Sequence, residues 1–169
     1  MALSLKMTED TGLLEKRDRC LDYLRKNKVD VGLTSSASGR SFFLLGIHSH
    51  GCPVMRIPPR PIMPQAVERD DLKMEMSEYL LDACEAAFDG DLSGTVAGME
   101  RCGQRGADGI REYIDGGIPP PNSPVTLGGG WIWNRVAKKG VHVGGKSGST
   151  PMKDTAQLYN DFDWEITGR

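Results

Sequence analysis

Apolar residues recur at helical spacing over three long stretches of the chain. The first predicted helix covers residues 7–28, with Thr8 as its N-cap and basic residues in its last turn. Its apolar stripe is narrow, so we expect this helix to lie on a surface rather than inside the protein. The stripe consists of Leu13, Leu14, Leu21 and Leu24.

The second predicted helix runs from about Pro64 to Phe88. Proline suits the first turn of a helix, and the second half of this stretch is broadly apolar. An Asp-Gly-Asp sequence then ends the helix at residues 89–91. The pattern therefore predicts one continuous helix across this stretch.

The third predicted helix covers residues 92–115. It contains five interior glycines, each of which costs about 1 kcal/mol relative to alanine, so packing must hold this helix together. Gly103 and Gly106 lie on its apolar face, where they let another backbone come close, either within one monomer or between subunits. That face consists of Leu92, Val96, Met99, Gly103, Gly106, Ile110, Tyr113 and Ile114.

Shorter elements fill the rest of the chain. Period-two alternation predicts strands at residues 29–33 and 161–166. The apolar run at 40–51 suits either a strand or a helix, because periodicity cannot decide at that length. Residues 131–149 have aromatic ends, glycine turns and basic residues between them, which indicates a hairpin or a mobile loop. A turn of helix is expected around 156–161, just before the last strand.

The first proline-dense segment joins the apolar run to the second helix. Pro58, Pro59, Pro61 and Pro64 exclude a helix and a central strand, and each proline favours an extended residue before it. We therefore predict an extended arm over about 52–64.

The second proline-dense segment follows the third helix and contains Pro119, Pro120 and Pro121. A stiff arm loses less conformational entropy on docking than a flexible one does. Our hypothesis is that both proline segments reach adjacent subunits. A flexible loop is predicted after the second segment, over about 128–150.

Composition limits the function without identifying it. A chain of 169 residues is expected to form one domain over 1–169. The net charge of −2 gives no bulk attraction to nucleic acid or to an anionic membrane, and no apolar run suggests a signal peptide or a membrane span. We expect a cytosolic product with reduced thiols, in which Cys84 and Cys102 are buried apolar residues. Cys20 and Cys52 complete the set, and no pair forms C-x-x-C.

One group of residues could bind a metal ion. His48, His50 and Cys52 alternate, so in a strand their side chains would share one face. No residue elsewhere completes the ligand set, and His142 is the only other histidine. The alternative is that they are polar residues at the end of a strand, and we predict no metal.

Residues 140–147 match the phosphate-binding loop pattern G-x-x-x-x-G-K-[ST] literally. That loop needs a buried strand before it and a long helix after it, and Gly148 and Pro151 exclude the helix. A flexible basic loop is the alternative. No G-x-S-x-G sequence and no Cys–His motif is present, so no recognisable motif for nucleophilic catalysis is found.

Three stretches together resemble a known family. They are IPPRPIMPQAVE at 57–68, GIREYIDGGIPPPNSPVTL at 109–127 and STPMKDTAQLYNDFDWEI at 149–166. In this order they are similar to the neck or tail-completion proteins of tailed bacteriophages, of the Mu-like and lambdoid type. The resemblance covers about Val29 to the C-terminus. It departs from the family pattern at Met152, Lys153 and Ala156.

The resemblance implies an α+β fold, with a small, mostly antiparallel sheet flanked by two long helices and with extended proline-rich arms. It implies a structural virion protein, assembled in the host cytoplasm, that forms a ring in the neck, collar or tail terminator. Such a protein is expected not to be an enzyme and to have no cofactor. The expected ring is a hexamer that joins the head connector to the tail. DNA would pass through its lumen without sequence-specific binding, and no membrane would be involved.

The expected partners are further copies of the chain, the head–tail connector, and the tail tube or terminator proteins. A place in the baseplate stays open, and so does the alternative of a metal- or nucleotide-dependent enzyme that uses His48, His50 and Cys52 or residues 140–147. The residues expected at subunit or partner interfaces are Pro58, Pro59, Arg60, Pro61, Met63, Pro119, Pro120, Pro121, Trp131 and Trp133.

Overall fold

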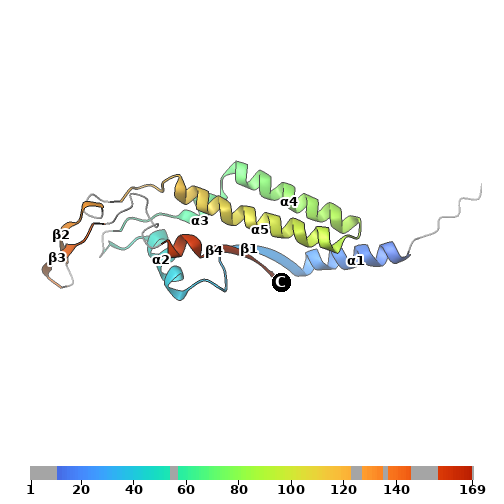
Figure 1. The fold of residues 1–169 in the computed structure, drawn as a ribbon, viewed down its shortest axis with the longest axis horizontal. Coiled ribbons are helices and arrows are strands. Elements are labelled where there is room, and N and C mark those ends of the chain that lie inside the picture. Colours follow the sequence, from blue (N-terminus) through green and yellow to red (C-terminus); the bar gives the residue numbers. More distant parts are fainter. Residues whose placement is uncertain (1–10, 54–56, 123–126, 135–136, 146–155, 169) are drawn as a thin grey trace, which may run out of the picture.

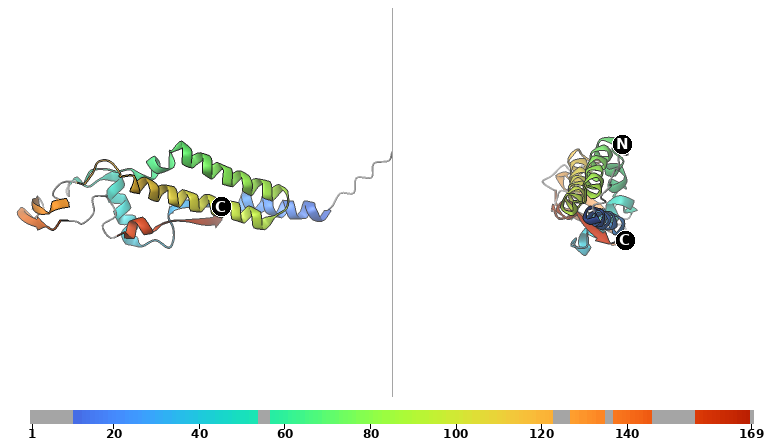
Figure 2. Two further views of the ribbon diagram at one scale, coloured as in Figure 1. Left: turned by 45° about the horizontal axis from the view of Figure 1, so that its top comes forward. Right: turned by 90° about the vertical axis from the view of Figure 1, so that its right-hand side faces the viewer.

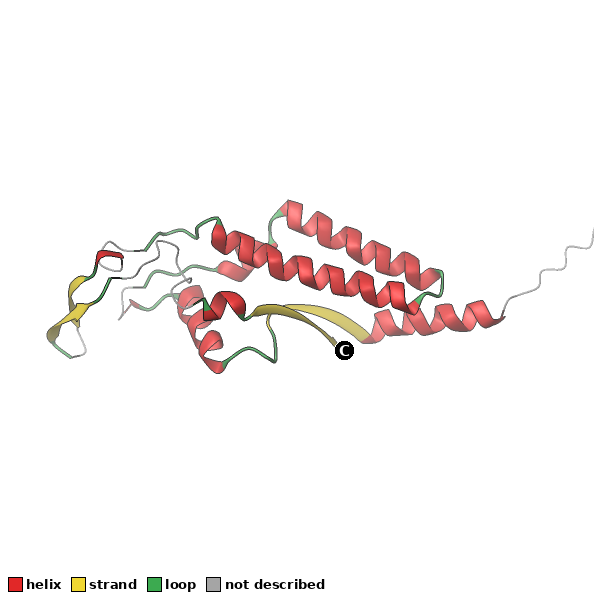
Figure 3. Cartoon of the chain, in the orientation of Figure 1, coloured by secondary structure: helices red, strands yellow, loops and turns green. Residues whose placement is uncertain are grey.

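The fold is α+β, as the sequence predicts. A computed structural model describes residues 11–53, 57–122, 127–134, 137–145 and 156–168 (Figure 3). Both sheets are two-stranded and antiparallel. The elements are α1 (Thr11–Lys26), β1 (Asn27–Leu33), α2 (Gly39–His50), α3 (Ile62–Val67), α4 (Asp70–Phe88), α5 (Leu92–Asp115), β2 (Gly130–Asn134), β3 (Lys139–Val143), α7 (Gln157–Asn160) and β4 (Phe162–Gly168).

The molecule is elongated, and its body is built around α5. Helices α4 and α5 lie side by side, and α5 also contacts both strands of the β1–β4 sheet (Figures 1 and 2). In that sheet Val31 is opposite Trp164, and Leu33 is opposite Phe162. Helix α1 extends one end of the body, and the β2–β3 hairpin lies at the other end (Figure 1).

The glycines of α5 mark close contacts within one chain. A Cβ on Gly98 would lie 2.7 Å from the Cβ of Ala83 in α4. A Cβ on Gly103 would lie 2.7 Å from the ring of Trp164 in β4, and one on Gly106 would lie 3.0 Å from Val31 in β1. Of the two alternatives that the sequence leaves open, intramolecular packing therefore accounts for Gly103 and Gly106.

The main hydrophobic cluster lies where α3, α5, α7 and β4 meet. It is completed by Ile118, which follows α5 at the start of the second proline segment. Residues that are distant in sequence are thus held in one core. The buried members are Ile62, Ala66, Ile110, Ile114, Ile118, Leu158 and Phe162.

The apolar run at 40–51 is a helix, α2. Ser38 caps it, because its side chain accepts a hydrogen bond from the amide of Ser41 at 3.2 Å. Asp161 supports the same turn, since its Oδ2 accepts from the Ser41 hydroxyl at 2.6 Å and from the Ser38 amide at 3.2 Å. These two bonds lower the pKa of the Asp161 carboxyl below its ordinary value of 3.8.

The prediction of a single helix from Pro64 to Phe88 is wrong. The chain forms two helices here, and the first begins earlier, at Ile62. The break lies at Arg69, whose ψ of 124° is extended and whose guanidinium pairs with Asp71 and Glu112. Asp70 and Asp71 in the first turn of α4 favour a new helix start there.

The other predicted elements are found close to their expected positions. Strands β1 and β4, the turn of helix α7 and a hairpin within 131–149 are all present. Residues 58–61 and 117–122 lie outside helices and strands, and their predicted role as arms stays a prediction. The predicted cap at Thr8 and residues 146–150 of the predicted loop lie outside the described residues.

Candidate interaction surfaces

The two proline segments meet inside the chain through Arg60. This residue is only 3% exposed. Its Nε donates a hydrogen bond to the carbonyl of Pro120 at 2.9 Å, and Nη2 lies 3.4 Å from the carbonyl of Pro121. Burial lowers the pKa of this guanidinium below its ordinary value. Arg60 therefore ties the first segment to the second.

The expected interface residues of these segments divide into two groups. Arg60 and Met63 serve the interior, because Met63 is half-buried against the main cluster and its methyl lies close to Gly32. Pro58 is half-buried. The rest are exposed, and their contact with a partner stays a prediction: Pro59, Pro61, Pro119, Pro120 and Pro121.

The β2–β3 hairpin presents two large aromatic side chains to solvent. Trp131 is 73% exposed and Trp133 is 59% exposed. They alternate along β2 and so share one face, on which Trp131 meets the edge of the His142 ring at 5.5 Å between centroids. Ile132 lies opposite Val141 on the other face. Trp131 and Trp133 were expected at an interface, and Ile132 was not.

A second exposed apolar surface, which was not predicted from the sequence, runs along α4. Met74 and Phe88 are each 63% exposed, and Leu81 between them is 59% exposed. Glu78 and Glu85 lie between them in the sequence and are also exposed. We call these five residues the α4 stripe. Their spacing of four, three, four and three residues was the available signal.

Charge distinguishes α4 from the hairpin. The helix carries six acidic residues and one lysine. Three of these acids form ion pairs with arginines. Asp71 pairs with Arg69, which precedes the helix. Asp82 pairs with Arg101 of α5 at 3.2 Å, and Glu75 pairs with Arg105 of α5. Glu78 and Glu85 have no ion pair among the described residues. The stripe is therefore both apolar and acidic.

The residues considered for a metal site do not converge. His48 and His50 lie in α2, where residues two apart point about 200° away from each other, so the common face that a strand would give is lost. Among the described residues, no group of three His, Cys, Asp or Glu side chains is placed to hold a metal ion. All four cysteines are free thiols.

The cysteine predictions hold in part. Cys102 is buried, and burial raises the pKa of its thiol above the ordinary value. Cys84 is only half-buried on α4, and Cys20 is buried in α1. The high thiol pKa at Cys102 favours a packing role over a reactive one.

Residues 140–143 of the phosphate-loop match are part of β3. An extended strand that pairs with β2 does not curve around a phosphate as a glycine-rich loop does. Lys146 and Ser147, which would contact the nucleotide, lie outside the described residues.

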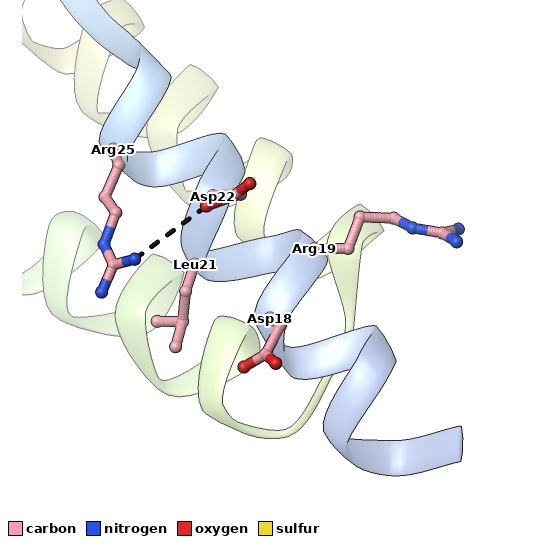
Figure 4. A pocket seen from close by; sticks show the side chains of 5 residues that line it. All are labelled: Asp18, Arg19, Leu21, Asp22 and Arg25. Carbon is pink, nitrogen blue, oxygen red and sulfur yellow. Dashed lines mark ion pairs between the residues drawn. The ribbon is translucent and has the colours of Figure 1, made fainter. Parts of the chain in front are cut away.

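A shallow depression on α1 offers no enclosed binding site. Its side chains are those of one helix and point largely into solvent (Figure 4). Arg25 and Asp22 form an exposed ion pair at 3.9 Å there. The residues that line the depression are Asp18, Arg19, Leu21, Asp22 and Arg25.

Among the described residues, no helix is long and apolar enough to cross a bilayer.

No family model, no curated protein and no solved structure matches this chain. The resemblance to phage neck proteins therefore depends on the three sequence stretches alone.

Proposed function

We propose that the chain is a structural virion protein of a tailed bacteriophage. It forms a ring that joins the head connector to the tail around the DNA channel. The observation that carries this proposal is that the three stretches behind the resemblance meet in one core. Ile62 comes from the first stretch, Ile118 from the second and Leu158 from the third, and all three are buried in the main cluster.

This convergence supports the resemblance because the stretches are far apart in sequence. Isolated proline motifs arise by chance in many loops. Here Arg60 of the first stretch bonds to carbonyls of the second, and Phe162 of the third is fully buried beside both. Because the three stretches pack against one another in one core, they favour the interpretation that they are parts of one inherited pattern.

The exposed apolar surfaces support assembly rather than a free monomer. Two exposed tryptophans on a hairpin and an apolar stripe on α4 mark sites of protein contact. The net charge of −2 suits a lumen that lets DNA slide without holding it. The proposal covers a collar, neck or tail-terminator ring, with six subunits as the expected number.

The first test is the mass of the purified protein in solution, by light scattering, alone and mixed with the candidate connector. A closed ring, or a monomer that assembles only on the connector, agrees with the proposal. Imaging of virions with a labelled copy then locates the ring. A stable monomer that ignores every virion protein contradicts the proposal.

A second test concerns the proline segments. Replacing Pro119, Pro120 and Pro121 with serine should weaken ring assembly, because a flexible segment loses more entropy on docking. The same three substitutions should leave the helix content of the monomer unchanged by circular dichroism. Unchanged assembly contradicts a role of these prolines in subunit contact.

A further inference from the structure

We infer that the β2–β3 hairpin of one copy docks on the α4 stripe of a second copy. This inference rests on the proposed function, because it names the surfaces through which the ring would close. The hairpin supplies tryptophans and lysines, and the stripe supplies apolar side chains between glutamates.

The hairpin needs a partner that the described chain does not supply. A two-stranded hairpin alone is marginally stable in water. Here both of its faces carry apolar side chains, with Trp131 and Trp133 on one and Ile132 and Val141 on the other. The hairpin projects from one end of the molecule, away from the helices of the body (Figure 1). A surface outside this chain would cover it.

The α4 stripe has the shape to receive it. At 100° per residue the five stripe residues fall within a sector of about 80°, so they form one straight row on the helix. The row from Met74 to Phe88 is about 21 Å long at 1.5 Å per residue. From its first to its last Cα, a strand of five residues such as β2 spans about 14 Å. The hairpin can therefore lie along most of the stripe.

Charge complementarity identifies the two surfaces as partners. Lys138 and Lys139 are exposed at the turn end of the hairpin. Lys139 lies opposite Asn134, on the face of Ile132 and Val141, and Lys138 precedes it in the turn. Glu78 and Glu85 alternate with the apolar residues of the stripe. Trp131 and Trp133 lie about 7 Å apart along β2, so they can cover two neighbouring apolar residues of the stripe, such as Leu81 and Phe88. Lys138 at the turn can then meet a glutamate of the stripe.

The same pattern argues against pairing of α4 with α4 of a second copy. In an antiparallel pair centred between Leu81 and Asp82, Glu78 of each helix would lie opposite Glu85 of the other. Carboxylates that face each other across a helix interface repel, which disfavours that arrangement. A basic and aromatic partner avoids this repulsion.

The positions of the two surfaces favour a ring. The hairpin lies at one end of the long axis, and α4 ends near α1 at the opposite end (Figures 1 and 2). Two different surfaces on one chain make a head-to-tail contact, which gives a ring where the rotation between neighbouring copies closes and an open filament where it does not. Ring closure lets several modest contacts act together, so each need not be strong.

The test uses two variants that each lose one surface. The hairpin variant carries Trp131→Ala and Trp133→Ala, and the stripe variant carries Leu81→Ser and Phe88→Ser. Each should remain monomeric where the natural protein assembles, in light scattering with or without the connector. Mixed in equal amounts, they keep one intact hairpin and one intact stripe between them. We expect the mixture to form a dimer of twice the 18.5 kDa chain mass and nothing larger.

Controls separate this contact from a general loss of structure. Leu13→Ser removes an exposed leucine of α1 outside the stripe and should leave assembly unchanged. In a charge-exchange test, one copy carries Lys138→Glu and Lys139→Glu, and the other carries Glu78→Lys and Glu85→Lys. Each copy alone should assemble poorly, because its hairpin and its stripe carry like charges. The mixture should assemble as the natural protein does, because each hairpin then meets a stripe of opposite charge. Circular dichroism checks that every variant retains its helices.

The outcomes distinguish the inference from the proposed function. If the natural protein assembles and either variant still assembles fully, the inference is wrong while the ring remains. If both variants are monomeric but their mixture forms no dimer, each surface meets another partner and the inference is also wrong. If the natural protein neither self-assembles nor joins the connector, the proposed function itself fails.

Discussion

Gly98 lies in tightly packed surroundings, whereas Trp131 is largely exposed to solvent. At Gly98 there is no room for a methyl group, because Ala83 of α4 already occupies that space. At Trp131 almost three quarters of the residue is in solvent. Gly98 is thus explained by a contact within the chain, whereas Trp131 is not. The difference separates positions that serve folding from exposed positions, on the hairpin and on the α4 stripe, that are available for contact with other chains.

The largest effect should come from filling the contact between α4 and α5. Gly98→Ala places a methyl within 3 Å of the Ala83 backbone, so the helices must separate, and we expect a loss of about 3 kcal/mol in the free energy of unfolding. Gly46→Ala in α2 is the matched control, because its methyl meets open space and should stabilise by up to about 1 kcal/mol. Urea denaturation measures both. Equal effects at the two sites would remove the close contact as the reason for Gly98.

The next largest loss of stability is expected where Arg60 of the first proline segment bonds to the second segment. Arg60→Met fills similar volume but leaves the carbonyls of Pro120 and Pro121 without their donor, which should cost about 2 kcal/mol. Arg40→Met, at an exposed position, should change stability by less than about 0.5 kcal/mol. Urea denaturation of both variants tests this. A negligible effect at Arg60 would mean that the joint does not stabilise the body.

A smaller, pH-dependent effect is expected at Asp161. Its pKa is lower in the folded chain than in the unfolded chain, so its contribution to stability is present above about pH 4 and is lost as the pH falls through the folded pKa. Asp161→Asn should therefore melt earlier than the natural protein at pH 7, and this difference should shrink on acidification. Thermal melts from pH 7 to pH 2.5 measure it, with Asp163→Asn at an exposed position as the control. A difference that is constant with pH contradicts this explanation.

The smallest effect should come from the hairpin when stability is measured on the monomer. Trp131→Ala with Trp133→Ala removes two large side chains but no contact with the body, so the free energy of unfolding should change by less than about 0.5 kcal/mol. Denaturation at a concentration where the natural protein is monomeric gives this value. A loss above about 1 kcal/mol would show that the hairpin packs against its own chain, and the contrast with Gly98 would disappear.

Local pattern in the sequence was sufficient for α5, β1 and β4, because each has a clear period. It left residues 131–149 open between a hairpin and a mobile loop. It was insufficient for α2, which is supported by Asp161 at a distance of 120 residues in sequence from Ser41. It also failed at Arg69, where side-chain pairing with Asp71 and Glu112 accompanies a break in an otherwise helical stretch.

The candidate surfaces show the same division. The exposure of Trp131 and Trp133 was predictable, since the basic and glycine-rich sequence around them offers no core. The inward role of Arg60 was not, because it depends on two carbonyls that lie 60 and 61 residues away. The spacing of Met74, Leu81 and Phe88 does not by itself predict an exposed surface, since helices that bury one face show the same spacing. The structure was needed to show that these three residues face solvent.

The pairing of β1 with β4 has a consequence for synthesis of the protein. Phe162 is added 129 residues after its partner Leu33. At ribosomal rates of 5–20 residues per second, β1 waits roughly 6 to 26 seconds for its neighbour. During that time the face of α5 that will hold Trp164 against Gly103 is also incomplete. The nascent chain therefore spends most of its synthesis with apolar surface exposed, and chaperones that bind such surfaces have their longest opportunity before residue 162 is made.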